Sequence, residues 1–291
     1  MCAVNHKPNL GRLRLLAVGL LATLVLASCQ PVRPVSQLLV ENEGRAGAVK
    51  PSAPPDESNH EEAHTYYNEG IALYESGDFE QAITRFDKAI EIDPNMAEIY
   101  VGRGIANFHR TFSNTTMTHF DEAKPDFDRA IELNPGLAEA YYHRGTTYMA
   151  AIGSFFLWFP VFVEQAKEDF EMYLELAPRG LNRDDAADML EILDDIDVEE
   201  LRQGTEQQIA RATSDIEQNP NDIDVYAYRE RAIYYASVGQ NDVAMQDIKL
   251  LMEVGAAANT LTQEQLEYFE SFTDNSFDLW SLIFLAPGIS E

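Results

Sequence analysis

Residues 63 to 94 read AHTYYNEGIALYESGDFEQAITRFDKAIEIDP. This stretch holds two amphipathic helical segments separated by Ser76-Gly77-Asp78, and glycine there favours a turn because it tolerates left-handed backbone conformations. Gly70 and Ala82 are small residues at positions where two antiparallel helices can approach closely. Pro94 ends the second segment, since proline removes a backbone donor. The stretch therefore predicts a closely packed pair of helices.

The same pattern returns twice further along the chain. A tyrosine stands four positions before a glycine in Tyr66-x3-Gly70, Tyr100-x3-Gly104 and Tyr141-x3-Gly145. A second segment follows each time, with the pattern Ala82-x3-Phe86 before Pro94, Ala123-x3-Phe127 before Pro135, and Ala166-x3-Phe170 before Pro178. A looser fourth match contains Tyr228, Ala232, Gly239, Ala244 and Ile248, with alanine in place of the first glycine. Stacked repeats of this kind bury one continuous core that no single pair could bury alone.

This recurring pattern resembles the tetratricopeptide repeat (TPR). The resemblance implies an all-α fold, a right-handed superhelical solenoid of TPR-type antiparallel helix pairs. A capping box at Thr262 and Gln265 predicts a C-terminal capping helix that covers the open end of the solenoid.

The sequence divides into six predicted segments. These are a signal peptide (1–28), a lipidated Cys29 with a flexible tether (29–62), three repeats (63–179), a degenerate helix pair (180–224), a fourth repeat (225–258), and a capping helix with an apolar tail (259–291).

The N-terminus has the pattern of an export signal. Lys7, Arg12 and Arg14 precede a run of twelve mostly apolar residues, Leu15 to Leu26, which is too short to cross a bilayer. Leu26-Ala27-Ser28-Cys29 resembles the lipobox of bacterial lipoproteins. In that family the chain is cut before the cysteine, which then carries a diacylglycerol and usually an N-linked acyl chain such as palmitate. We therefore expect an extracytoplasmic lipoprotein of the cell envelope, anchored to a membrane through Cys29; the alternative is an uncleaved signal or a chance cysteine.

Charge and composition exclude several partners. The formal net charge of -28 makes a nucleic-acid partner unfavourable, because affinity for phosphates depends on Lys and Arg. The chain has two cysteines, Cys2 in the signal and Cys29 at its end, so the predicted mature domain has no free thiol for a disulfide or a thiolate metal site. We expect no cofactor, no resident metal and no small-molecule substrate.

The TPR resemblance also implies a concave groove lined by the first helix of each pair. Carried over residue by residue, the groove positions are Tyr67, Ile71, Tyr74, Val101, Ile105, Phe108, Tyr142, Thr146 and Met149. A lysine and asparagine clamp that some members use to capture carboxylate tails is absent at the corresponding places. An apolar segment of a protein or peptide partner suits such a groove. Some of these side chains belong equally well to a core.

Repeats two and three are longer than repeat one at the turn inside the pair. From the glycine to the first alanine of the second helix the chain takes 12, 19 and 21 positions. The third insert is almost wholly apolar and predicts either a local core or an edge that contacts a partner or a membrane, through Phe155, Phe156, Trp158, Phe159 and Phe162. We also expect the apolar tail Phe277 to Leu285 to dock on the solenoid.

One motif suggests chemistry. His60-Glu61-Glu62-Ala63-His64 matches the H-E-x-x-H pattern, in which two histidines one helical turn apart hold zinc and the glutamate activates water. A zinc-dependent hydrolase is therefore one alternative, and a subunit of a secretion or polymer-export complex is another. The favoured prediction is a non-enzymatic adaptor lipoprotein that binds a protein partner.

Overall fold

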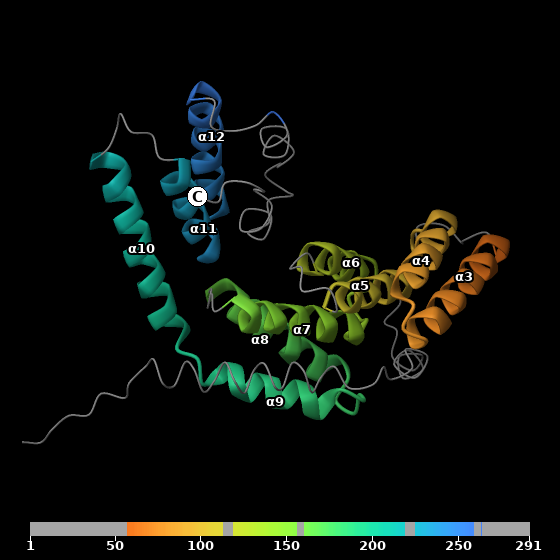
Figure 1. Ribbon diagram of the computed structural model, residues 1–291. Helices are drawn as coiled ribbons and strands as arrows, with labels where there is room; N and C mark the ends of the chain where they lie inside the picture. Colours follow the sequence, from red (N-terminus) through yellow and green to blue (C-terminus); the bar gives the residue numbers. More distant parts are fainter. Residues whose placement is uncertain (1–56, 113–118, 156–159, 219–224, 259–262, 264–291) are drawn as a thin grey trace, which may run out of the picture.

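The computed structural model describes residues 57–112, 119–155, 160–218, 225–258 and 263. Regular structure in these ranges is entirely helical (Figure 1). The helices are α3 (Glu57–Glu75), α4 (Phe79–Ile92), α5 (Ala97–Phe112), α6 (His119–Leu133), α7 (Ala138–Phe155), α8 (Pro160–Leu176), α9 (Arg183–Asp194), α10 (Val198–Gln218), α11 (Val225–Ser237) and α12 (Asn241–Ala258). The predicted all-α fold class is confirmed. None of the described helices is long and apolar enough to cross a membrane.

The helices pack as consecutive pairs. α3 pairs with α4, α5 with α6, and α7 with α8, while α4 contacts α5 and α6 contacts α7. Figure 1 shows these three pairs stacked in chain order. The stack follows the order that the recurring sequence pattern predicted.

Large aromatic rings fill the space that the glycines leave. The ring of the fully buried Phe86 on α4 lies against Gly70 of its own pair and Gly102 of the next. A Cβ atom added at Gly70 would stand 2.6 Å from Phe86 Cε1, and one at Gly102 would stand 2.9 Å from the same atom. Phe127 occupies the same place against Gly104. Glycine is therefore required at these contacts within a pair and between pairs.

Glycine and aspartate shape the turns. Gly77 has φ +85° and Gly239 has φ +79°, conformations that strain residues with a side chain. Asp78 follows the first turn and caps α4 by accepting a hydrogen bond from the backbone N–H of Gln81. Asp197 accepts from the N–H of Glu200 in the same manner at the start of α10.

The start of α3 tests one predicted boundary. α3 begins at Glu57, within the segment that we assigned to the flexible tether, so the prediction that the tether reaches residue 62 is wrong. The start of α3 is held by His60, whose Nδ1 lies 3.0 Å from Asp93 Oδ2 just after α4.

The predicted degenerate pair does not pack as a pair. Both of its helices form, but α9 packs against α8, whereas α10 packs mainly against α11 and also touches α8. α9 turns Ala186, Met189 and Leu193 into the core of the preceding pair. α10 has only Thr205 and Ala212 as buried residues, so it contributes little side-chain volume to the core. Figure 1 shows α10 extending from the end of α9 toward α11 and α12.

The fourth repeat forms the pair α11 and α12, with Ala232, Ala244 and Ile248 buried as the pattern predicted. Two clusters of buried apolar side chains make up the core, one from α3 to α7 and one from α7 to α12. α7 belongs to both, since Leu137 just before it and Ala140 lie in the first cluster and Tyr142 in the second. Cys29, the capping-box residue Thr262, the rest of the predicted capping helix after Gln263, and the tail from Phe277 to Leu285 lie outside the described residues.

Two glycines offer a matched test of this packing. Gly70→Ala places a methyl group against the buried Phe86 ring, so we expect the free energy of unfolding to fall by about 1–3 kcal/mol. Gly204 lies inside α10 with open space around its missing Cβ, so Gly204→Ala should raise it by roughly 0.5–1 kcal/mol. Urea unfolding measures both changes. Equal effects of the two substitutions would contradict the assigned contact.

Candidate protein-binding surface

The residues predicted to line the groove all lie on the first helices of the pairs, α3, α5 and α7. Most of these side chains are buried: Tyr67, Ile71, Tyr74, Val101, Ile105, Tyr142 and Met149. These long side chains reach into the core. The ring of Tyr142, for example, lies next to the buried ring of Tyr173, with 5.2 Å between the two centroids. These seven belong to the core and do not line an open groove. Phe108 and Thr146 are half-buried and reach the surface of this inner face, which we define as the exposed side of α3, α5 and α7.

The predicted apolar edge is only partly described. Phe162 on α8 is buried, and the centroid of its ring lies 5.9 Å from that of Tyr148 on α7. For this residue the prediction of a local core is confirmed, and the prediction of an exposed edge is wrong. The backbone of Phe155 ends α7. Phe156, Trp158 and Phe159 lie outside the described residues.

The H-E-x-x-H motif lies on the first turns of α3. Its two histidine rings are neighbours, with centroids 4.8 Å apart, but His60 is engaged with Asp93. Among the described residues, no three His, Cys, Asp or Glu side chains gather closely enough to hold a metal ion. His60 thus links the start of α3 to the end of α4.

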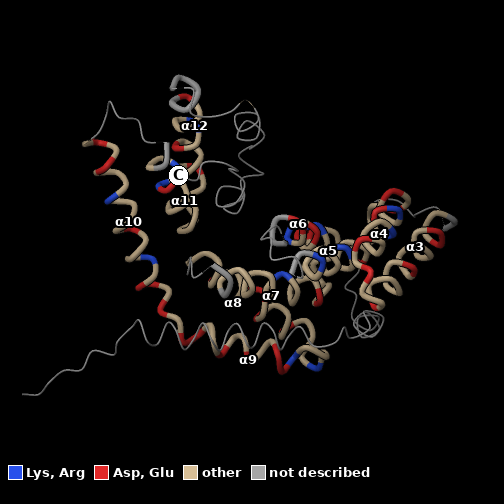
Figure 2. The backbone as a smooth tube through the Cα atoms, in the orientation of Figure 1, with Lys and Arg blue, Asp and Glu red and all other residues tan. Residues whose placement is uncertain are grey.

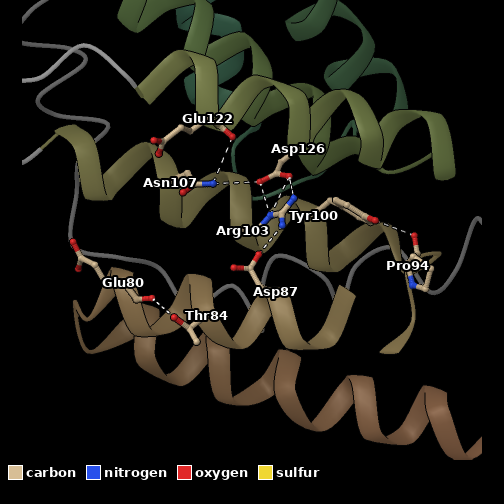
Figure 3. Close-up of polar contacts among 9 residues, drawn as sticks. All are labelled: Glu80, Thr84, Asp87, Pro94, Tyr100, Arg103, Asn107, Glu122 and Asp126. Atoms are coloured by element: carbon tan, nitrogen blue, oxygen red, sulfur yellow. Dashed lines mark hydrogen bonds and ion pairs between the residues drawn. The ribbon is translucent and has the colours of Figure 1, made fainter. Parts of the chain in front are cut away.

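The strongest polar contacts of the stack were not predicted. Arg103 on α5 binds two carboxylates from two different helices (Figure 3). Its Nη1 lies 2.6 Å from Asp87 Oδ1 on α4, the preceding pair, and its Nη2 lies 2.6 Å from Asp126 Oδ1 on α6. Arg103 Nε also donates to Asp126, at 3.0 Å from Oδ2. One guanidinium therefore joins three helices, and paired donors of this kind give both strength and geometry.

The same contact recurs one pair later. Arg144 on α7 lies 2.7 Å from Asp128 of the preceding pair and 2.7 Å from Asp169 of its own pair. Each arginine also packs over the tyrosine three positions before it, at 5.7 Å from the ring centroid of Tyr100 and 5.8 Å from that of Tyr141. We name each arginine with its two aspartates an arginine clamp.

The first and fourth repeats have altered versions of the clamp. In the first repeat the charges are reversed, because Glu69 stands at the arginine position and pairs with Arg85 at 3.3 Å. In the fourth repeat Arg231 pairs with Asp247 at 2.6 Å, and its Nη1 donates to Thr213 on α10 in place of an aspartate. Within the described helices, the full clamp is present only on α5 and α7, where one repeat stacks directly on another.

A sequence signal for the clamp exists. Repeats two and three share Tyr-x2-Arg-Gly in the first helix and Ala-x2-Asp-Phe in the second. The arginine and aspartate of each clamp stand directly beside the glycine and phenylalanine that identify the repeat. Charge reversal at Glu69 and Arg85 is the same signal in repeat one, since both members of the pair change together.

Burial keeps two histidines of α5 and α7 uncharged. It lowers the pKa of His109 to about 4. Burial, and then the neighbouring His109, lowers the pKa of His143 to about 3. Both imidazoles are therefore neutral at physiological pH and add no positive charge to the inner face. Figure 2 shows acidic residues spread along the stack, α9 and α10, with fewer basic ones among them.

Residues 70–109, which span the last part of α3, all of α4 and most of α5, match the family model of the TPR repeat. The chain contains a TPR repeat. With the ordered packing of α3 to α8, this match gives the described stack a TPR-type fold. No curated protein matches the sequence.

Several solved structures are similar to parts of this chain. The first TPR domain of Spaghetti (RPAP3), bound to the HSP90 peptide SRMEEVD, is 24% identical, with 46% of this chain and 94% of that domain covered and a TM-score of 0.39. The MamA protein is 20% identical, with 69% and 97% covered and a TM-score of 0.36. A tetratricopeptide repeat protein from Parabacteroides merdae is 19% identical, with 78% and 85% covered and a TM-score of 0.35.

Removing a clamp arginine should make stability depend more steeply on pH. Burial raises the pKa of Asp169 to about 6, and Arg144 opposes this rise. In Arg144→Leu the carboxyl loses its guanidinium, so its folded pKa rises further above the unfolded value. A raised carboxyl pKa means that stability is retained at low pH and lost as pH rises through the folded pKa. We expect Arg144→Leu to cost about 3–5 kcal/mol at pH 8 and clearly less at pH 5.

Urea unfolding of the Arg144→Leu variant at both pH values measures this difference. Arg129→Leu is the control, because Arg129 and its partner Glu132 are both exposed. That change should cost less than about 1 kcal/mol at either pH. A loss in Arg144→Leu that is the same at pH 5 and pH 8 would contradict the role of the buried Asp169 carboxyl.

Proposed function

We propose that this protein is a lipid-anchored adaptor of the bacterial cell envelope that holds a protein or peptide partner on its TPR stack. The observation that carries the proposal is the ordered stack α3 to α8, in which arginine clamps fix each pair to the next. A TPR-type fold fits a module for protein interaction. A rigid stack also presents one face without the entropic cost of ordering it at the moment of binding.

The inner face of α3, α5 and α7 is the proposed contact surface. It combines half-buried Phe108 and Thr146 with exposed His64, so it offers apolar area with polar groups beside it. The three arginines of these helices, Arg103, Arg110 and Arg144, are all paired with carboxylates. The face therefore suits a partner that is apolar or basic and does not suit an acidic one.

The proposed anchor is the lipidated Cys29, preceded by the export signal. The segment from residue 30 to the start of α3 at Glu57 is rich in Pro, Ser, Gly and Glu, a composition typical of a flexible tether. Such a tether allows the TPR stack to reach a partner at some distance from the membrane surface.

Substitutions on the inner face should abolish capture of the partner. The double variant Phe108→Glu and Thr146→Glu adds charge at half-buried positions of α5 and α7, which an apolar partner segment would have to desolvate. Affinity capture from detergent-solubilised envelopes, with proteins identified by mass spectrometry, should lose the partner found with the unaltered chain. Met172→Glu, on the second helix α8 and 36% exposed, is the matched control and should retain it. Equal capture by both variants would place the site elsewhere.

The anchor has a test of its own. Cys29→Ala should abolish labelling by radioactive palmitate and release the protein from the membrane fraction, since several acyl chains are needed for stable anchoring. Cys2→Ala is the control, because this cysteine leaves with the signal and should not affect labelling. Unchanged labelling of Cys29→Ala would refute the anchor but leave the adaptor proposal intact.

A further inference from the structure

The last helix pair carries a positive charge where the earlier pairs carry a clamp aspartate. Asp87 on α4 and Asp128 on α6 each follow the core phenylalanine of their repeat, and each binds the arginine of the following pair. On α12 the corresponding core residue is Ile248, and Lys249 follows it. Lys249 is exposed, and no carboxylate among the described residues forms an ion pair with it. The sign of this clamp position is therefore inverted at the end of the described helices.

The first helix pair shows the opposite inversion. Glu69 on α3 stands where the clamp arginines stand on α5 and α7. Arg85 on α4 stands where Asp126 stands on α6, and its Nε lies 3.3 Å from Glu69 Oε2. The side chain of Glu69 is 48% exposed, compared with 26% for Arg103, because no described helix pair precedes α3 and covers it. The Glu69 carboxylate thus has one charged partner where each clamp arginine has two.

The two ends of the molecule are complementary. Figure 1 shows α3 at one end of the described helices and α12 at the other. If α12 of one copy packs on α3 of another, as α4 packs on α5, Glu69 lies between Arg85 of its own copy and Lys249 of the other. Every charge of the arginine clamp is then inverted, and the pairing is kept.

We propose that copies of this chain associate head to tail, with α12 of one copy packed on α3 of the next. Glu69 binds Arg85 of its own copy and Lys249 of the neighbouring copy, a set that we name the reversed clamp. The contact joins two different surfaces, so it repeats from copy to copy. The inference goes beyond the proposed adaptor function, because it needs no other protein.

The surface of α3 around Glu69 is open to such a contact. Thr65 and Ala72 lie about one helical turn before and after Glu69, and both are exposed. Their counterparts on α5, Ile99 and Ala106, are buried in the stack. Small residues on this side of α3 let a second helix approach closely.

The sizes of the side chains at the two ends are also complementary. Within the stack the ring of Phe86 lies against Gly102 of the next pair. The corresponding residues at the two ends are Ile248 on α12 and Asn68 on α3. Isoleucine is smaller than phenylalanine, so the place that glycine leaves open within the stack has room for asparagine at this contact.

A polar outer face is expected at both ends of a solenoid, because end repeats meet water. Solubility requires charge there, but it does not require opposite signs at matching clamp positions. The predicted capping helix after α12 competes for the same face. The unpaired Glu69 carboxylate at the other end of the molecule favours a second copy, since a capping helix on α12 leaves it without a second partner.

Sedimentation velocity of the full lipidated chain in detergent, over a series of concentrations at physiological ionic strength, tests the contact. The unaltered chain should form oligomers as its concentration rises. Lys249→Glu places like charges together and should weaken this association by at least about tenfold. Lys88→Glu makes the same change of charge at an exposed position of α4 and should leave association unaltered. Equal association of the unaltered chain and Lys249→Glu would overturn the reversed clamp.

A charge swap gives a second readout. The double variant Glu69→Arg and Arg85→Asp gives the first pair the signs of an ordinary clamp, so alone it should also associate poorly. Mixed with the Lys249→Glu variant it should form oligomers again, because opposite charges then meet at every contact. A mixture that stays monomeric would overturn the pairing.

The same measurements identify the competing occupant of α12. An unaltered chain that stays monomeric at every concentration would overturn head-to-tail association. A lower melting temperature of Lys249→Glu in that case would assign Lys249 to the predicted capping helix of its own chain. Either result would leave the adaptor function untouched.

Discussion

The contact between an aromatic ring and a missing side chain sets the geometry of this protein. Phe86 lies where Gly70 and Gly102 leave room, so its own pair and the next approach one another at a distance that no larger residue permits. Phe127 against Gly104 and Phe170 against Gly145 repeat the contact along the stack. Protein interiors are packed too densely for such rings to move aside. The spacing of the helices, the position of the arginine clamps and the shape of the inner face all follow from this contact.

The arginine clamps use the regular spacing that these contacts create. Each clamp arginine binds one aspartate of its own pair and one of the pair before it. Each clamp therefore joins two pairs that are consecutive in the stack. Buried charges are costly unless they are paired, and a guanidinium with two carboxylates meets this condition only when three helices are in register. The clamps also engage Arg103 and Arg144, two of the arginines on the first helices of the pairs.

The sequence predicted the pairs, their order and their turns, because small residues, prolines and turn glycines recur at fixed spacing. It did not predict the depth of individual side chains. The positions of Tyr67 and Tyr142 on their helices were correct, but a position on a helix does not fix how far a long ring reaches into the core. The acidic segment after Pro178 was predicted to form a helix pair. Both helices form, yet α9 packs against α8 and α10 packs mainly against α11, because the apolar pattern of a helix does not name its neighbour. The clamp residues recur in the sequence as Tyr-x2-Arg-Gly and Ala-x2-Asp-Phe. The sequence does not show which aspartate an arginine will bind, because that depends on which helices the fold brings together.

The central claim is that an ordered TPR stack meets its partner through the inner face of α3, α5 and α7. Photo-crosslinking in intact cells tests it most directly, with a photoreactive amino acid placed singly at His64, Phe108 or Thr146 on the inner face, or at Arg129 or Met172 on the second helices. We expect one common crosslinked partner from the first three positions and none from the last two. Crosslinks to that partner only from Arg129 and Met172 would contradict it.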